Sequence, residues 1–110
     1  MNAGIQFVQV AGLDEISNGE RLFFEIDNLQ IVLFNIAGQF FAIGDICTHD
    51  NGPLGEGEIN GFEVTCPRHG ARFDVRNGQA VRLPAVNSTP SYPVRIVDGM
   101  IEIGIRIESR

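Results

Sequence analysis

Dipeptides in which Asn or Asp precedes Gly recur along this chain of 110 residues and divide it into short segments. Such dipeptides favour tight turns, because these residue types tolerate the positive φ angles of hairpin turns. The segments between them are rich in branched and aromatic residues, and none shows a sustained apolar pattern at helical spacing. The sequence therefore predicts an all-β fold. The dipeptides include Asn18-Gly19, Asn60-Gly61, Asn77-Gly78 and Asp98-Gly99.

The segments predict ten short strands. A polar connection at residues 13–20 has room for a helical turn, and Asp27-Asn28 is the expected turn between two strands. Asn60-Gly61 predicts a two-residue hairpin turn of type I′, in which both central residues have positive φ. Residues 83–91 contain two prolines and predict an irregular loop. The expected strands cover residues 7–11, 21–26, 29–36, 40–43, 57–59, 62–65, 73–76, 79–81, 92–97 and 100–105.

The composition is that of a globular domain, with 44% apolar and 20% charged residues. A length of 110 residues predicts one domain and leaves no room for a separate catalytic domain. The net charge of −6 disfavours binding to nucleic acid or to anionic membranes. No apolar stretch is long enough for a signal peptide or a membrane span, so we expect a cytoplasmic protein. In that reducing compartment the two cysteines are better explained as metal ligands than as a disulfide.

Every cysteine and histidine falls in two motifs, Cys47-Thr48-His49 and Cys66-Pro67-Arg68-His69, separated by sixteen residues. Each motif follows a predicted strand, and the Asn60-Gly61 hairpin lies between them, so the two loops are expected to meet. Two thiolates and two imidazoles suit either a tetrahedral zinc ion or a Rieske-type cluster of two irons. Zinc modules commonly place both cysteines on one arm, whereas here each arm supplies one Cys and one His. The mixed arms favour the cluster, and structural zinc stays open.

The two motifs resemble the ligand loops of the Rieske family, in which Cys-x-His is followed at a similar distance by Cys-x-x-His. The resemblance covers nearly the whole chain and is strongest over residues 43–97. It implies an all-β, Rieske-type antiparallel β-sandwich in a single domain, residues 1–110. Within it, two ligand loops form a small cluster-binding subdomain at about residues 44–82. Further matching residues are Leu54, Gly70, Phe73-Asp74, Leu83-Pro84-Ala85 and Tyr92-Pro93-Val94.

The resemblance also implies the cofactor, which is one Rieske-type [2Fe–2S] cluster per chain. Cys47 and Cys66 would bind the inner iron, and His49 and His69 would bind the outer iron. Gly70 is interpreted as a residue that lets backbone amides approach the cluster sulfurs, with an ordinary turn as the alternative.

Four positions depart from the high-potential branch of the family. Respiratory-complex Rieske proteins carry an additional cysteine in each ligand loop, and these form a disulfide where this chain has Gly52 and Arg68. A serine and a tyrosine of that branch, which donate hydrogen bonds to the cluster, are here Ala71 and Phe73. Fewer donors stabilise the reduced cluster less, so the expected reduction potential is near the low end of the Rieske range, about −150 mV.

The resemblance to the ferredoxin components of bacterial ring-hydroxylating dioxygenase systems implies a soluble one-electron carrier. It would dock transiently, as a monomer, with an NAD(P)H-dependent flavin reductase and a terminal non-haem iron oxygenase. Arg68 and Arg72 would either steer such a partner or be solvated surface residues. The chain is not expected to be an oxygenase itself, because no histidine remains for a mononuclear iron. The small Rieske-like subunit of a nitrite reductase or a similar redox complex is an alternative, as is a structural zinc module.

Overall fold

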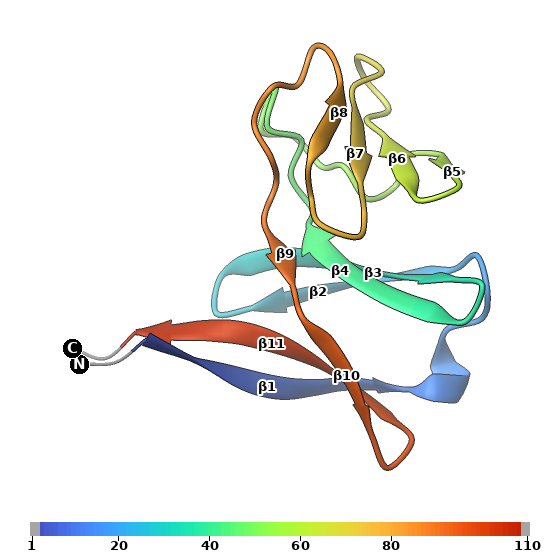
Figure 1. Ribbon diagram of the computed structural model, residues 1–110, viewed down its shortest axis with the longest axis vertical. Coiled ribbons are helices and arrows are strands. Elements are labelled where there is room, and N and C mark those ends of the chain that lie inside the picture. Colours follow the sequence, from blue (N-terminus) through green and yellow to red (C-terminus); the bar gives the residue numbers. More distant parts are fainter. Residues whose placement is uncertain (1–2, 109–110) are drawn as a thin grey trace.

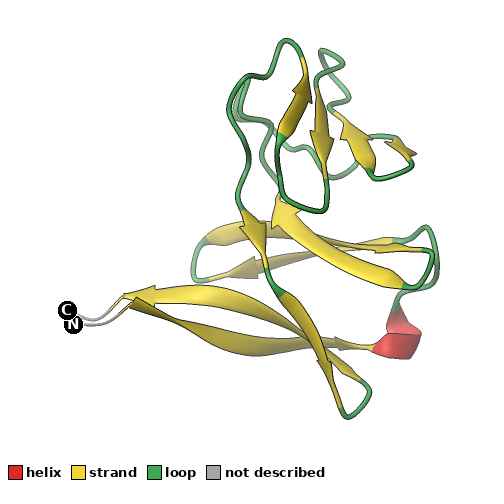
Figure 2. Ribbon diagram, viewed as in Figure 1, coloured by secondary structure: helices red, strands yellow, loops and turns green. Residues whose placement is uncertain are grey.

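The computed structural model describes residues 3–108, which form three antiparallel sheets and one short 3-10 helix (Figures 1 and 2). Two of the sheets pack face to face, and together they are called the base. The first base sheet has the order β1-β11-β10, and the second has the order β2-β3-β4-β9. The predicted all-β sandwich is confirmed. The base elements are β1 (Ala3–Gly12), η1 (Leu13–Glu15), β2 (Arg21–Ile26), β3 (Leu29–Ile36), β4 (Gln39–Gly44), β9 (Ser91–Tyr92), β10 (Val94–Val97) and β11 (Met100–Glu108).

The third sheet, called the small sheet, lies above the base in Figure 1 and has the order β5-β6-β7-β8. Its strands contain only two or three residues each. The chain enters this part of the molecule after β4 and returns to the base at β9, and no strand lies between β8 and β9, as predicted for the proline-containing loop. The strands of the small sheet are β5 (Ile59–Asn60), β6 (Glu63–Thr65), β7 (Arg72–Asp74) and β8 (Ala80–Arg82).

Two hairpins of the base turn where the sequence predicts. Asp27 and Asn28 have φ of 50° and 66°, and Asp98 and Gly99 have φ of 51° and 77°. Both turns therefore have two consecutive positive φ angles, which is the type I′ conformation that suits the twist of paired strands. Consequently, β2 pairs with β3 and β10 with β11 without a shift in register.

The hairpin of the small sheet turns one residue later than predicted. Asn60 pairs with Glu63, so the central residues of the turn are Gly61 and Phe62. In this turn only Gly61, with φ of 61°, has a positive φ. This corresponds to a type II′ turn, which needs Gly at its first central position alone. The prediction of a type I′ turn at Asn60-Gly61 is wrong, because the register of β5 against β6 places Asn60 in the ladder.

The third strand, β3, is buried on both faces over most of its length. Ile31 and Leu33 point into the core between the two base sheets, whereas Val32 and Phe34 point into a second core beneath the small sheet. This arrangement follows from the alternation of side chains along a strand. A continuous apolar run in β3 therefore joins the base to the small sheet.

The first strand is longer than predicted, because β1 pairs with β11 from Ala3 to Gly12 with one irregularity near Gln9. The 3-10 helix at Leu13–Glu15 occupies part of the connection where a helical turn was expected. No helix within residues 3–108 has the length and apolar character to cross a membrane.

Candidate metal centre

The loops that begin at Cys47 and Cys66 have the same pattern of backbone hydrogen bonds. In each loop, the cysteine N–H donates to the carbonyl five residues later, and the cysteine carbonyl accepts from the N–H four residues later. The residue four positions after each cysteine has a positive φ, which is 63° at Asn51 and 78° at Gly70. A Cβ on Gly70 would meet no protein atom within 4 Å, so within the protein itself the positive φ of the turn is what favours glycine here. The N···O distances are Cys47 to Gly52 2.8 Å, Asn51 to Cys47 2.7 Å, Cys66 to Ala71 2.7 Å and Gly70 to Cys66 3.1 Å.

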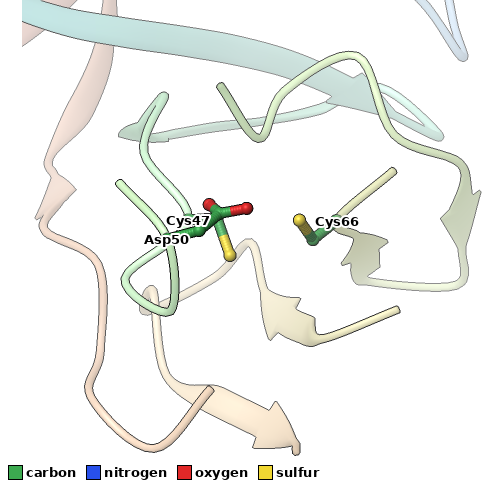
Figure 3. A group of neighbouring side chains, drawn as sticks. All are labelled: Cys47, Asp50 and Cys66. Carbon is green, nitrogen blue, oxygen red and sulfur yellow. The ribbon is translucent and has the colours of Figure 1, made fainter. Parts of the chain in front are cut away.

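The structure brings all four predicted ligand residues to the same end of the molecule. Cys47 and Cys66 are buried and face each other from the two loops (Figure 3). His49 and His69 are exposed, and their rings meet edge to face with centroids 4.9 Å apart. The thiols therefore lie on the inner side of the site and the imidazoles on the outer side.

The donor atoms form two groups that share Asp50. One group contains the sulfurs of Cys47 and Cys66, the other contains ring nitrogens of His49 and His69, and within each group all ligand atoms lie within 4.8 Å of one another. In the described part of the chain no such group contains all four cysteine and histidine ligands. A single tetrahedral zinc ion needs its four ligands around one point. Separate thiol and imidazole pairs suit two metal ions with different ligands, as in a Rieske cluster.

Burial and neighbouring backbone amides have opposite effects on the pKa of each buried thiol. Burial raises the pKa of Cys47, and this effect exceeds the opposing effect of the backbone amides of His49 and Asp50. Burial acts in the same direction on Cys66, but the backbone amides of Arg68 and His69 and the thiol of Cys47 outweigh it and lower the pKa. The backbone amides around Cys66 thus favour its thiolate, which is the form that binds metal.

The inner side of the site is apolar. The cysteines belong to a core that includes residues of β3, β4 and the small sheet. Ala71 and Phe73 are completely buried in this core, and neither side chain offers a hydroxyl donor. Other buried members are Val32, Phe34, Ile43, Leu54, Val64, Val75 and Ala85.

The first loop is anchored to the base and to the small sheet. The Asp45 carboxylate accepts the N–H groups of Leu54 and Gly55 at 2.9 and 2.6 Å. Arg21 of β2 donates to the carbonyls of Gly55 and Gly57 at 2.5 and 2.6 Å. A Cβ on Gly57 would lie 1.7 Å from the Thr65 carbonyl oxygen, so only glycine fits there.

Arg68 joins the two loops, which the sequence analysis did not anticipate. Its guanidinium donates to both carboxylate oxygens of Asp50, at 2.6 and 2.8 Å. This contact holds the pKa of Asp50 well below its ordinary value and raises the pKa of Arg68. The available signal was the opposite charge of Asp50, directly after His49, and of Arg68, directly before His69.

The proline-containing loop also contacts the first ligand loop. The Thr48 hydroxyl donates to the Asn87 carbonyl at 2.5 Å. Leu83 and Val86 of this loop are 72% and 74% exposed, which leaves two large apolar side chains on the surface. The Leu83-Pro84 peptide bond is cis.

Comparison with known proteins shows the family. Residues 6–93 match the family model described as the Rieske [2Fe-2S] domain, and the chain belongs to this family. The 3-phenylpropionate/cinnamic acid dioxygenase ferredoxin subunit of Escherichia coli K12 is 38% identical over 93 residues, which cover 83% of this chain and 86% of the relative. The ferredoxin component of the Pseudomonas putida naphthalene 1,2-dioxygenase system is 29% identical over 92 residues, covering 84% and 88%.

A solved structure agrees with this assignment. The ferredoxin of carbazole 1,9a-dioxygenase from Nocardioides aromaticivorans IC177 superposes with a TM-score of 0.83 at 30% identity, covering 88% of this chain and 95% of that one. The predicted resemblance and the predicted cofactor, a Rieske-type [2Fe–2S] cluster, are therefore confirmed.

Proposed function

We propose that Cys47, His49, Cys66 and His69 hold the cluster. The thiolates of Cys47 and Cys66 would bind the inner iron, and the imidazoles of His49 and His69 the outer iron. The separation of buried thiols from adjacent exposed imidazoles carries this proposal, because it matches the two-plus-two ligand set of a Rieske cluster. The domain is proposed to extend over residues 1–110, with the cluster-binding subdomain at about residues 44–82.

The proposed function is one-electron transfer between an NAD(P)H-dependent flavin reductase and a terminal non-haem iron oxygenase. Relatives of this size are named as ferredoxin components of dioxygenase systems, which supports a carrier that is not itself an enzyme. The cluster supplies the one-electron chemistry when bound. The protein screens the thiol side with its apolar core and leaves His49 and His69 at the surface, which makes the imidazoles the exit for the electron. The carrier would act as a cytoplasmic monomer and dock transiently.

The ligand assignment is tested by iron, sulfide and zinc analysis of purified protein, together with visible and electron paramagnetic resonance spectra after reduction. The expected result is two irons and two sulfides per chain and an average g-value below that of an all-cysteine cluster. His69→Ala is expected to lose the cluster, whereas Gln79→Ala, at an exposed turn in the small sheet, keeps it. Zinc without iron in the wild type, or a native spectrum in His69→Ala, contradicts the assignment.

The electron-transfer role predicts a low reduction potential, about −150 mV, because buried Ala71 and Phe73 offer no hydroxyl to the cluster sulfurs. A redox titration of the holoprotein measures the midpoint. The double variant Ala71→Ser/Phe73→Tyr is expected to have a higher midpoint than the wild type. A clearly positive midpoint in the wild type rules out the low-potential assignment.

A further inference from the structure

Arg68 donates the three hydrogen bonds that join the two ligand loops, and a longer polar contact of 3.4 Å joins His69 Nδ1 of the second loop to Asp50 Oδ2 of the first. Arg68 lies between Cys66 and His69 in the second loop, and its guanidinium reaches across to the first loop. Its Nε and Nη2 atoms donate to Asp50 Oδ2 and Oδ1 at 2.6 and 2.8 Å, and its Nη1 donates to the Pro53 carbonyl at 2.8 Å. Within residues 3–108, the hydrogen bonds that cross from residues 47–53 to residues 66–71 all come from Arg68.

The first loop is shaped to receive this guanidinium. Gly52 donates its N–H to Asp50 Oδ1 at 3.0 Å, which orients the carboxylate. A Cβ on Gly52 would lie 2.6 Å from Arg68 Nη2, so a larger residue would push the guanidinium away. The backbone turn from Cys47 to Gly52 places the Asp50 carboxylate and the Pro53 carbonyl on the side that faces the second loop.

The contact between Arg68 and Asp50 is more constrained than an ordinary surface ion pair. The Arg68 and Asp50 side chains are 35% and 21% exposed, so solvent competes only in part. Two parallel hydrogen bonds to one carboxylate hold both groups in a fixed relative orientation, and the third bond ties the same guanidinium to the backbone. A lysine at this position keeps the charge but cannot form the parallel pair.

We propose that Arg68 is a positioning residue that braces the two ligand loops through Asp50 and Pro53 and thereby retains the cluster. The proposal rests on the ligand assignment above. The guanidinium lies beside Gly52, and Gly52 and Arg68 are the two positions at which this chain departs from the disulfide of the high-potential branch. A brace of hydrogen bonds needs no oxidising compartment.

The brace also places two opposite charges beside the outer side of the site. Reduction adds negative charge to the site, so the guanidinium favours the reduced state and the Asp50 carboxylate opposes it. Loss of Arg68 therefore lowers the reduction potential, and loss of the Asp50 charge raises it. Both changes weaken the brace. Both substitutions are therefore expected to speed cluster loss, whereas they shift the reduction potential in opposite directions.

The test measures cluster loss and midpoint potential in holoprotein variants. After dilution into an iron chelator, Arg68→Met is expected to lose its visible absorption about tenfold faster than the wild type, because three hydrogen bonds are removed. Arg68→Lys is expected to lose its cluster at an intermediate rate and to keep a near-native potential. Asp50→Asn also loses its cluster faster, but its potential shifts upward while that of Arg68→Met shifts downward. Arg95→Met, which breaks the Arg95–Glu102 ion pair of the base, is the matched control with an unchanged rate.

Cluster loss at the wild-type rate in Arg68→Met would overturn the proposal. Shifts of the potential in the same direction in Asp50→Asn and Arg68→Met would also overturn it, since they would indicate a general disturbance of the site. If Arg68→Met does not load a cluster, the rates of cluster loss in Arg68→Lys and Asp50→Asn provide the test. Loss at the wild-type rate in both variants would overturn the proposal. A wild-type protein without iron would instead refute the ligand assignment, so the two failures are distinguishable.

Discussion

The base and the small sheet reach their structures by different means. In the base, β1 and β11 pair along nine or ten residues, and the core between the sheets is formed by side chains that alternate along each strand. In the small sheet, the strands have two or three residues, and the predicted ligands lie in the loop that leads from β4 to β5 and in the loop between β6 and β7. Short strands bury little surface by themselves. The small sheet is therefore expected to depend on the core that it shares with β3 and β4, on its anchored loops and on the cluster.

The third strand shows how the two parts are connected. Leu33 belongs to the base core and the neighbouring Phe34 belongs to the core that contains Cys47 and Cys66. Because neighbouring residues of a strand point to opposite faces, this one strand contributes side chains to both cores. We therefore expect the cluster end to depend on the base for its stability.

Removal of the cluster is expected to have the largest effect. Without metal, the amides of β6 and β7 should lose hydrogen-exchange protection on the order of a hundredfold or more, since a bound cofactor stabilises the part that it cross-links. The amides of β3 and β11 should stay protected. Hydrogen exchange of holoprotein and chelator-treated protein, followed by mass spectrometry, measures both. Equal loss of protection in the base would show that the two parts unfold together.

Substitution of neighbouring residues in β3 is expected to have the next largest effect. Leu33→Ala should destabilise the base by about 2–5 kcal/mol, and Phe34→Ala should destabilise the small sheet by about 3–5 kcal/mol. Both side chains are almost completely buried, and Arg21 lies 5.4 Å above the Phe34 ring. Leu29→Ala, at an exposed site of the same strand, is the control.

The readouts for these variants are the midpoint of thermal unfolding, by circular dichroism, and the rate of cluster loss into a chelator. Leu33→Ala is expected to lower the midpoint, and Phe34→Ala is expected mainly to accelerate cluster loss. Identical behaviour of the two variants would contradict the separation of the cores along β3.

The smallest expected effect is a pH dependence from the small sheet. The Arg76 guanidinium lowers the pKa of Asp74, with a contact of 2.8 Å between Nη2 and Oδ2. A carboxyl whose pKa is lower in the folded state stabilises the fold above its unfolded value of about 4, and this stability is lost as the pH falls through the folded pKa. Asp74→Asn should therefore weaken the holoprotein at pH 7, and its difference from the wild type should shrink below about pH 4.

This dependence is measured as the urea concentration that bleaches the cluster at each pH. Arg76→Gln should cause a loss similar to that of Asp74→Asn, and the double variant should add little, because the two groups act as a pair. A difference between wild type and Asp74→Asn that stays constant from pH 7 to the lowest pH at which the cluster persists would contradict the assignment.

Much of the fold was predictable because it depends on local patterns. The β2–β3 hairpin was predicted with its observed bounds, since Asp27-Asn28 separates two apolar runs and accepts positive φ at both positions. The turn of the small sheet was misplaced by one residue. The local preference of Asn60-Gly61 was overruled by the pairing of Asn60 with Glu63, which depends on the packing of β6 against β7.

The sequence by itself determined the chemistry of the site, because a two-plus-two ligand set at this spacing has few chemical uses. Only the tertiary structure decided how that set is held. The bridge from Arg68 to Asp50 joins residues eighteen positions apart, and Arg21 reaches residues more than thirty positions away. Such contacts depend on the distance between folded segments, and no local preference of the chain specifies that distance.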